Sequence, residues 1–298
     1  MDAVIGLVRA LLPVTVALHA QIPGDHPSVA ILGDERMGSG VVVEPGVLLT
    51  VNYVVMGGRS IRATYPDGEC VEVKILAQDY ENGLAVLRVP QSAGAFATLG
   101  DSRALVKGEE VFVLGSTGPT ERRVSNGVIT DLGPFEAYWE YMLDSAVQSS
   151  AINPGFGGAP LFDRRGRLLG ITSLSLGRVA RFSLAIPIHL FAESREDLLR
   201  YGRVRGRARR AWVGVYAEPA TMGVAVAGLV PDGPAARAGV RDGDVIQTVN
   251  FAEVASREEL YRQLWKQPAG AVVRLGILRE TERLMIEVAS GDRADFYR

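Results

Sequence analysis

Residues 151–161 read Ala151-Ile152-Asn153-Pro154-Gly155-Phe156-Gly157-Gly158-Ala159-Pro160-Leu161, a glycine-rich turn that leads into apolar residues. Around this turn, from Val14 to about Ile188, short β-branched runs alternate with glycine and proline at close intervals. Such punctuation is typical of an all-β barrel or sandwich. The sequence therefore predicts a mainly β architecture here, with no amphipathic helix interrupting it.

Two further segments precede the turn. The first joins Gly38-Ser39-Gly40-Val41-Val42-Val43 to Leu48-Leu49-Thr50-Val51-Asn52-Tyr53-Val54-Val55, and the second is Asp79-Tyr80-Glu81-Asn82-Gly83-Leu84-Ala85-Val86-Leu87-Arg88-Val89. In order and spacing the three segments resemble the HtrA/Deg family of trypsin-like proteases. Bacterial members of that family join a double β-barrel to a PDZ peptide-binding domain and act in protein quality control. The resemblance implies the same fold for this chain.

In that family the three segments carry a general-base histidine, an orienting aspartate and a nucleophilic serine. The resemblance places Tyr53, Gly83 and Gly157 at these positions. The reaction needs an alcohol, an imidazole and a carboxylate in one geometry. A phenol is a poor proton acceptor at neutral pH, and glycine has no side chain. We therefore expect a catalytically inactive homologue, a pseudoprotease and not an enzyme.

The rival interpretation is a serine-type endopeptidase with a relocated catalytic set, which requires a histidine beside a hydroxyl in the cleft. The histidines of this chain are His19, His26 and His189. Each is expected to be a surface or strand-end residue. Ser149 and Ser150 are the hydroxyls nearest the degenerate turn, and we interpret both as structural.

The oxyanion hole is the part of the family site that can be retained here. The resemblance assigns it to the backbone N–H groups of Gly155 and Gly157. The opposing interpretation is that Phe156 and Tyr53 fill the vacated cleft. Filling is the favoured expectation, because burying an aromatic ring gains about 2 kcal/mol.

Beyond residue 188 the short β-branched runs give way to a predicted helix and an arginine-rich stretch. The predicted domains are a double β-barrel over 1–190, a helix and arginine-rich linker over 191–210, a PDZ domain over 211–290 and a tail over 291–298. The linker has five arginines in residues 203–210. We interpret it as a solvated connection, with an anionic contact left open, because no wider basic face accompanies it.

The PDZ assignment depends on the run Pro231-Asp232-Gly233-Pro234-Ala235-Ala236-Arg237-Ala238-Gly239-Val240-Arg241-Asp242-Gly243-Asp244-Val245-Ile246, which is similar to a run in bacterial family members. Pro234 can start a short helix that Gly239 ends. Further on, Ser256 and Glu259 have the spacing of a helix capping box.

A PDZ domain adds a peptide as a strand at a sheet edge and holds the terminal carboxylate with backbone N–H groups. The resemblance assigns the carboxylate loop and edge to Trp212, Val213, Gly214 and Val215, with Leu260 and Leu264 as the far wall or as ordinary core. Expected partners are protein C-termini, extended peptides or an active protease relative. A third interpretation is a structural scaffold, in which the chain itself closes the groove.

The composition of the chain argues against several classes of function. The net charge is −2 and the charged fraction 22%, so no global field would recruit nucleic acid. The single cysteine, Cys70, excludes an internal disulfide and a cysteine-built metal site, and we expect it to be a packed thiol. No metal or cofactor is implied.

No apolar run is long enough to span a membrane. Residues 5–20 are apolar, but Pro13 and the lack of basic residues before them make a poor signal peptide. Residues 12–18 are instead expected to form the first strand. The predicted location is cytoplasmic for a full-length chain and otherwise the cell envelope, and both monomer and trimer remain open.

Overall fold

The computed structural model describes residues 2–90, 94–175 and 182–298, which divide into two compact units. The first unit contains residues 1–134 and 144–205, and the second contains 135–143 and 206–298. These limits differ from the predicted domains. The helix after residue 188 belongs to the first unit, the tail belongs to the second, and residues 135–143 leave the predicted barrel for the second unit.

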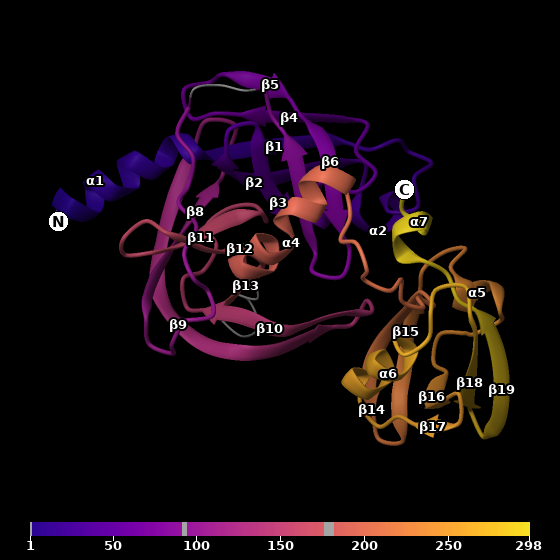
Figure 1. The fold of residues 1–298 in the computed structure, drawn as a ribbon. Helices are drawn as coiled ribbons and strands as arrows, with labels where there is room; N and C mark the ends of the chain where they lie inside the picture. The colour runs from indigo at the N-terminus through magenta and orange to yellow at the C-terminus, as the bar shows by residue number, and fades with distance from the viewer. Residues whose placement is uncertain (1, 91–93, 176–181) are drawn as a thin grey trace. The chain divides into compact units, whose positions relative to one another are not determined.

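The first unit has two antiparallel β structures (Figure 1). One is a seven-stranded sheet in the order β5-β4-β1-β2-β3-β7-β6 and the other is a closed barrel in the order β10-β13-β12-β11-β8-β9. The sheet is made of β1 (Thr15–Gln21), β2 (Glu35–Glu44), β3 (Val47–Val51), β4 (Ser60–Thr64), β5 (Cys70–Glu72), β6 (Lys74–Asp79) and β7 (Leu84–Arg88). The barrel is made of β8 (Glu110–Ser116), β9 (Arg122–Ala137), β10 (Tyr141–Ser149), β11 (Ala159–Asp163), β12 (Leu168–Ser175) and β13 (Ser183–Pro187).

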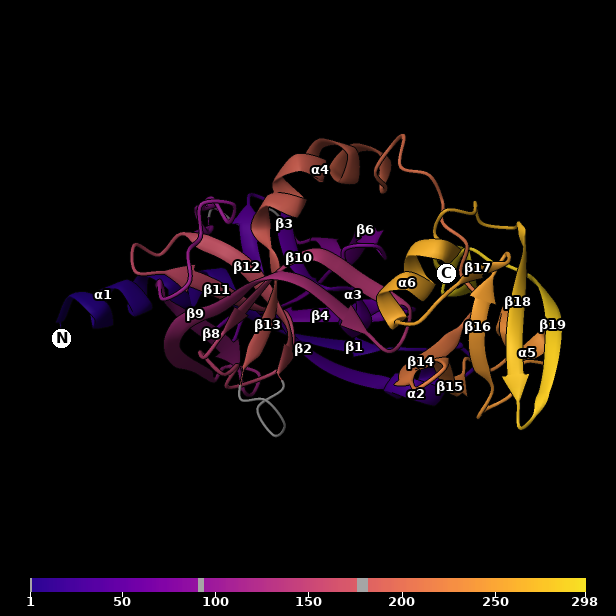
Figure 2. The ribbon, with the colours of Figure 1, turned by 90° about the horizontal axis from the view of Figure 1, so that it is seen from below.

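The prediction of a mainly β fold is confirmed. The continuous apolar runs of the sequence form the buried strands of the core. Every residue of β3, β11 and β13 is buried, because these strands are covered on both faces. Figure 2 shows the long strands β9 and β10 running together toward the turn that joins them.

Several local predictions need correction. The N-terminus forms α1 (Asp2–Leu11) and the 3-10 turn η1 (Leu12–Val14), so β1 starts at Thr15 instead of residue 12. Pro13 lies in the first turn of η1, where its fixed φ and missing N–H are tolerated. Two single helical turns, α2 (Val29–Leu32) and α3 (Asn52–Val55), also interrupt the strands.

Cys70 is exposed, which contradicts the packed-thiol prediction. It begins β5, the short edge strand of the sheet, where half of the side chains face away from the core.

The second unit contains a sheet in the order β14-β15-β16-β18-β19, with β17 paired to β16. The turn 135–143 lies with it. Its elements are β14 (Val215–Ala220), β15 (Gly223–Leu229), α5 (Pro234–Arg237), β16 (Val245–Val249), β17 (Ala252–Glu253), α6 (Arg257–Leu264), β18 (Val272–Arg279), β19 (Glu282–Ala289) and α7 (Arg293–Phe296).

Local signals in this unit act as the sequence predicts. Pro234 occupies the first turn of α5, and Gly239 follows with a φ of 87°. The Ser256 hydroxyl accepts the Glu259 N–H at 3.1 Å, while the Glu259 carboxylate accepts the Ala255 N–H at 2.7 Å. This capping box begins α6 and orients its inward face.

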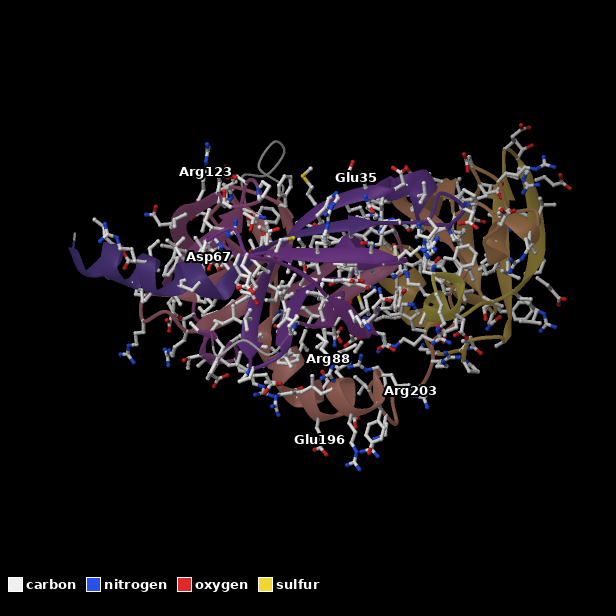
Figure 3. The ribbon with its side chains drawn as sticks, turned by 90° about the horizontal axis from the view of Figure 1, so that it is seen from above. Glu35, Asp67, Arg88, Arg123, Glu196 and Arg203 are labelled. Carbon is white, nitrogen blue, oxygen red and sulfur yellow. The ribbon has the colours of Figure 1, made fainter. Side chains whose placement is uncertain are left out.

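The arginine-rich segment follows α4 (Ile188–Tyr201). Figure 3 shows Glu196 and Arg203 on the outer side of this region. Arg205 binds Asp197 within the first unit. Arg209 contacts Asp292 and Asp295 within the second, where Arg210 also lies over the Trp265 ring. Three of the five arginines of this segment therefore make contacts within the chain: two form ion pairs with aspartates and one stacks on a tryptophan ring.

Among the described residues, no helix is long and apolar enough to cross a membrane.

Candidate functional site

Tyr53 lies in α3, directly after β3, and its side chain points to the turn of residues 151–161. Its hydroxyl donates to the Ser173 carbonyl at 2.8 Å. A Cβ built on Gly157 would lie 2.8 Å from Tyr53 Cζ and closer still to Oη. The phenol therefore occupies the space beside Gly157, which agrees with the part of the filling interpretation that concerns Tyr53. Burial raises the pKa of Tyr53 to about 12, so this group is a neutral donor at neutral pH.

Ser39 holds the turn in place. Its N–H donates to the Gly157 carbonyl at 2.7 Å, and its hydroxyl donates to the Phe156 carbonyl at 3.1 Å. The same hydroxyl accepts the Ser116 N–H at 3.0 Å. Gly158 has a φ of 92° and packs against the Ser39 carbonyl without room for a Cβ. The glycine-rich sequence is thus required by close backbone contacts.

Gly83 has a φ of 77°, a left-handed conformation that side chains with a Cβ rarely adopt. Its N–H donates to the Asp79 carbonyl at 2.7 Å, and its carbonyl accepts the Asn52 N–H at 2.8 Å. Asp79, a carboxylate of the same segment, accepts the N–H groups of Glu81 and Asn82 within its own turn. The backbone of Gly83 therefore favours glycine through its left-handed φ, whereas at Gly157 it is the Tyr53 side chain that leaves no space for a Cβ.

The residual oxyanion hole requires a correction. The Gly155 N–H donates to Asn153 Oδ1 at 3.1 Å, and the next amide, that of Phe156, donates to the Ser116 carbonyl at 3.1 Å. An asparagine side chain commonly accepts the amide two residues on. The Gly155 donor is therefore already used within the turn.

The histidines form local contacts. His19, in β1, lies 2.6 Å from Glu35, and His26 Nδ1 lies 2.7 Å from the Ser28 hydroxyl. His189, at the start of α4, has its Nδ1 2.8 Å from the Ser102 hydroxyl, which also accepts the His189 N–H.

Two serine–histidine pairs therefore exist within the described residues. Ser28 is 1% exposed and Ser102 is 6% exposed. Of the two hydroxyls interpreted as structural, Ser150 Oγ accepts the Val128 N–H at 3.0 Å, and Ser149 is 2% exposed.

Residues 212–215 of the second unit form the loop that the sequence predicts to bind a carboxylate. Gly214 has a φ of 80°, and this left-handed residue directs consecutive N–H groups to one point. The N–H groups of Val213, Gly214 and Val215 donate at 3.2, 2.5 and 2.8 Å to a single carboxylate, that of Glu140. Glu140 lies in the turn between β9 and β10 and is 2% exposed.

The remaining predicted residues have distinct positions. Leu260 and Leu264 are fully buried in the same apolar cluster as Val213 and Val215. Trp212 pairs through its backbone with Gly291 and packs on Phe296, with ring centroids 4.7 Å apart. Trp212 thus anchors the tail and lies outside the set of amide donors.

Sequence reasoning missed Glu140, which stands 73 residues before Val213 in the chain. No spacing rule links a hairpin turn to a loop so far away. In the described part of the chain, no cluster of histidine, cysteine and carboxylate side chains could hold a metal ion.

Comparison with protein families gives two matches. A trypsin-like peptidase domain matches residues 38–171, and a PDZ domain matches residues 211–289. The first match covers part of the first unit together with residues 135–143, and the second covers most of the second unit.

Relatives and solved structures agree with these matches. The chain is similar to probable periplasmic serine endoproteases, DegP-like, of Halomonas elongata (32% identity over 87% of this chain) and Pseudomonas savastanoi (29% over 92%). It spans 57% and 60% of the length of these relatives. An HtrA-type protease solved with a decapeptide has 26% identity and a TM-score of 0.58, covering 97% of this chain and 98% of its own. A serine endoprotease from Yersinia pestis has 25% identity, a TM-score of 0.58 and 97% coverage of both chains.

These comparisons contradict the prediction that the chain is not an enzyme. Relatives at about 30% identity over most of the chain are named serine endoproteases, and the solved neighbours are proteases. They point to an enzyme. Hydrolysis by this chain would use side chains other than those at positions 53, 83 and 157, which supply no serine, histidine or aspartate.

Proposed function

We propose that this chain, which matches a trypsin-like peptidase domain and a PDZ domain and is similar to HtrA/DegP-like proteases, binds protein C-termini or extended peptides through its PDZ domain. The observation that carries the proposal is the convergence of three backbone N–H groups on one carboxylate. A peptide C-terminus presents the same group. By analogy with the names of its relatives we place the protein in the periplasm, where exposed protein ends or an active protease relative would be the partners.

Peptides that end in a free apolar residue should bind the full chain more tightly than the same peptides with an amidated end. Hydrogen bonds to a charged group contribute about 1.5–3 kcal/mol, so amidation should weaken binding by about tenfold or more. Calorimetry with matched free and amidated peptides measures the ratio. Equal affinities would contradict recognition of the C-terminus.

A second candidate function is peptide-bond hydrolysis, which the names of the relatives favour. The Ser102–His189 pair is the more accessible of the two described serine–histidine pairs. Burial, aided by the Arg103 charge and opposed by Asp101, lowers the pKa of His189. A neutral imidazole can accept a proton from a neighbouring hydroxyl.

Under this second candidate, Ser102→Ala should abolish hydrolysis of an unfolded protein substrate, and a serine-directed phosphonate should label Ser102 of the unaltered chain. Ser150→Ala is the matched control and should leave both unchanged. Circular dichroism should verify folding, because Ser102 also caps α4. Hydrolysis that survives Ser102→Ala would exclude this pair.

A further inference from the structure

We propose that Glu140 is an internal ligand of the PDZ carboxylate-binding loop and excludes peptide C-termini until the turn that carries it withdraws. The inference rests on the proposed function, because it concerns the same loop. The occupant of this loop is the side-chain carboxylate of Glu140, which takes the place of the C-terminal carboxylate of a peptide.

The polar contacts leave no room for both ligands. Glu140 Oε1 accepts the N–H groups of Gly214 and Val215 at 2.5 and 2.8 Å, and Oε2 accepts that of Val213 at 3.2 Å. A terminal carboxylate held by backbone N–H groups needs the same donors. Binding of one ligand therefore displaces the other.

The backbone of the turn of residues 135–143 also makes contacts of the kind that a bound peptide would make. β14 is an edge strand of its sheet, and the Ala217 N–H in this strand donates to the Tyr138 carbonyl at 2.7 Å. On the other side, the Tyr261 hydroxyl of α6 donates to the Ala137 carbonyl at 2.6 Å and accepts the Glu140 N–H at 3.0 Å. The turn thus lies between the edge strand and the helix, as a peptide added to the sheet would.

The apolar part of the groove is occupied as well. Met142, two residues after Glu140, is 8% exposed and belongs to the buried cluster of Val213, Leu260 and Leu264. An apolar peptide side chain would enter a pocket of this composition. Both the charged and the apolar determinants of a C-terminal ligand are therefore supplied by residues 135–143.

Two features favour release. Glu140 has a φ of 53°, a conformation that costs energy in a residue other than glycine and marks functional segments. Burial raises the pKa of the Glu140 carboxyl, although the N–H groups of Val215, Val213 and Gly214 and the charge of Arg293 lower it. Withdrawal into water would relieve the desolvation of this charge.

Other contacts oppose release and keep the turn ordered. Arg293 donates to the carbonyls of Glu140 and Trp139, and Arg257 lies 3.5 Å from Glu136. A tethered ligand also has a high effective concentration. If one molecule in about ten is open, the apparent affinity for a peptide falls about tenfold.

The test uses the full chain and a fluorescent peptide with a free, apolar C-terminal residue. Glu140→Gln keeps the side-chain shape and removes the charge, so we expect the peptide to bind up to about tenfold more tightly. Glu253→Gln, at an exposed acid of the same unit, is the matched control and should leave affinity unchanged. Equal affinity for the unaltered chain and Glu140→Gln would overturn the proposal.

Nuclear magnetic resonance separates this proposal from the proposed function. Glu140→Gln should shift the amide signals of Gly214 and Val215, and added peptide should shift the Trp139 indole signal of the unaltered chain, assigned with Trp139→Phe. If neither protein binds peptide, the proposed function is contradicted, and shifted amide signals would still support internal occupancy. Unshifted amide signals would overturn occupancy whatever the peptide does.

Discussion

Gly157→Ser should destabilise the first unit by about 2–4 kcal/mol. The new Cβ would overlap the Tyr53 phenol, so the ring must move and give up its hydrogen bond to the Ser173 carbonyl. Overpacking costs about 1–3 kcal/mol and a lost buried hydrogen bond about 1 kcal/mol more. All three tryptophans, at 139, 212 and 265, belong to the second unit. The affected transition should therefore appear in calorimetry without a matching change in tryptophan fluorescence.

A double-mutant cycle identifies the cause. Tyr53→Ala removes the obstructing ring, so adding Gly157→Ser to it should cost about 2 kcal/mol less than in the unaltered chain. In Gly157→Ser alone, the introduced hydroxyl should also resist serine-directed phosphonates, because its neighbour Tyr53 is a neutral phenol and not an imidazole. Additive effects of the two substitutions would contradict the overlap.

Asp244→Ala should destabilise the second unit by about 3 kcal/mol. Asp244 is 1% exposed and accepts Arg279 Nε and Nη2 at 2.7 and 2.8 Å and the Arg241 N–H at 2.8 Å. Removing one partner of a buried pair costs about 3–5 kcal/mol, and we take the lower value because Arg279 is 22% exposed. Denaturation followed by tryptophan fluorescence measures the loss.

The loss should depend on pH. Burial raises the pKa of Asp244, but hydrogen bonds from Arg279 and Arg241 and their charges outweigh it, so the pKa lies below its ordinary value. The stabilisation is therefore complete at neutral pH and disappears as the pH falls through the ordinary carboxyl pKa toward the lowered one. Asp242→Ala, at an exposed neighbour, should change stability little at any pH. A loss of stability that did not diminish in acid would rule out the charge contribution.

Local chemistry explains which structural features the sequence predicts well. Pro234, Gly239 and the Ser256–Glu259 pair act on residues a few positions away, so their effects follow from spacing alone. The mainly β architecture around the turn of residues 151–161 also follows from the sequence, because short β-branched runs alternate there with glycine and proline.

Long-range contacts explain what the sequence could not predict. The carboxylate loop was placed from its own residues, but its occupant, Glu140, comes from a hairpin turn 73–75 residues away. The family resemblance assigns the Gly155 N–H to an oxyanion hole. In the structure, Oδ1 of Asn153, two residues away, accepts the hydrogen bond from this N–H. This contact follows the common tendency of an asparagine side chain to accept the amide two residues on.

The fit between Tyr53 and Gly157 imposes an order on any mutational path toward a serine–histidine–aspartate set. A serine at position 157 is obstructed while Tyr53 remains, and an aspartate at position 83 must adopt the left-handed φ of 77°. Replacement of Tyr53 is the permissive first step, and the reverse order passes through a destabilised intermediate. Single substitutions at 83 or 157 are therefore expected to lower the stability of the first unit as long as Tyr53 is present.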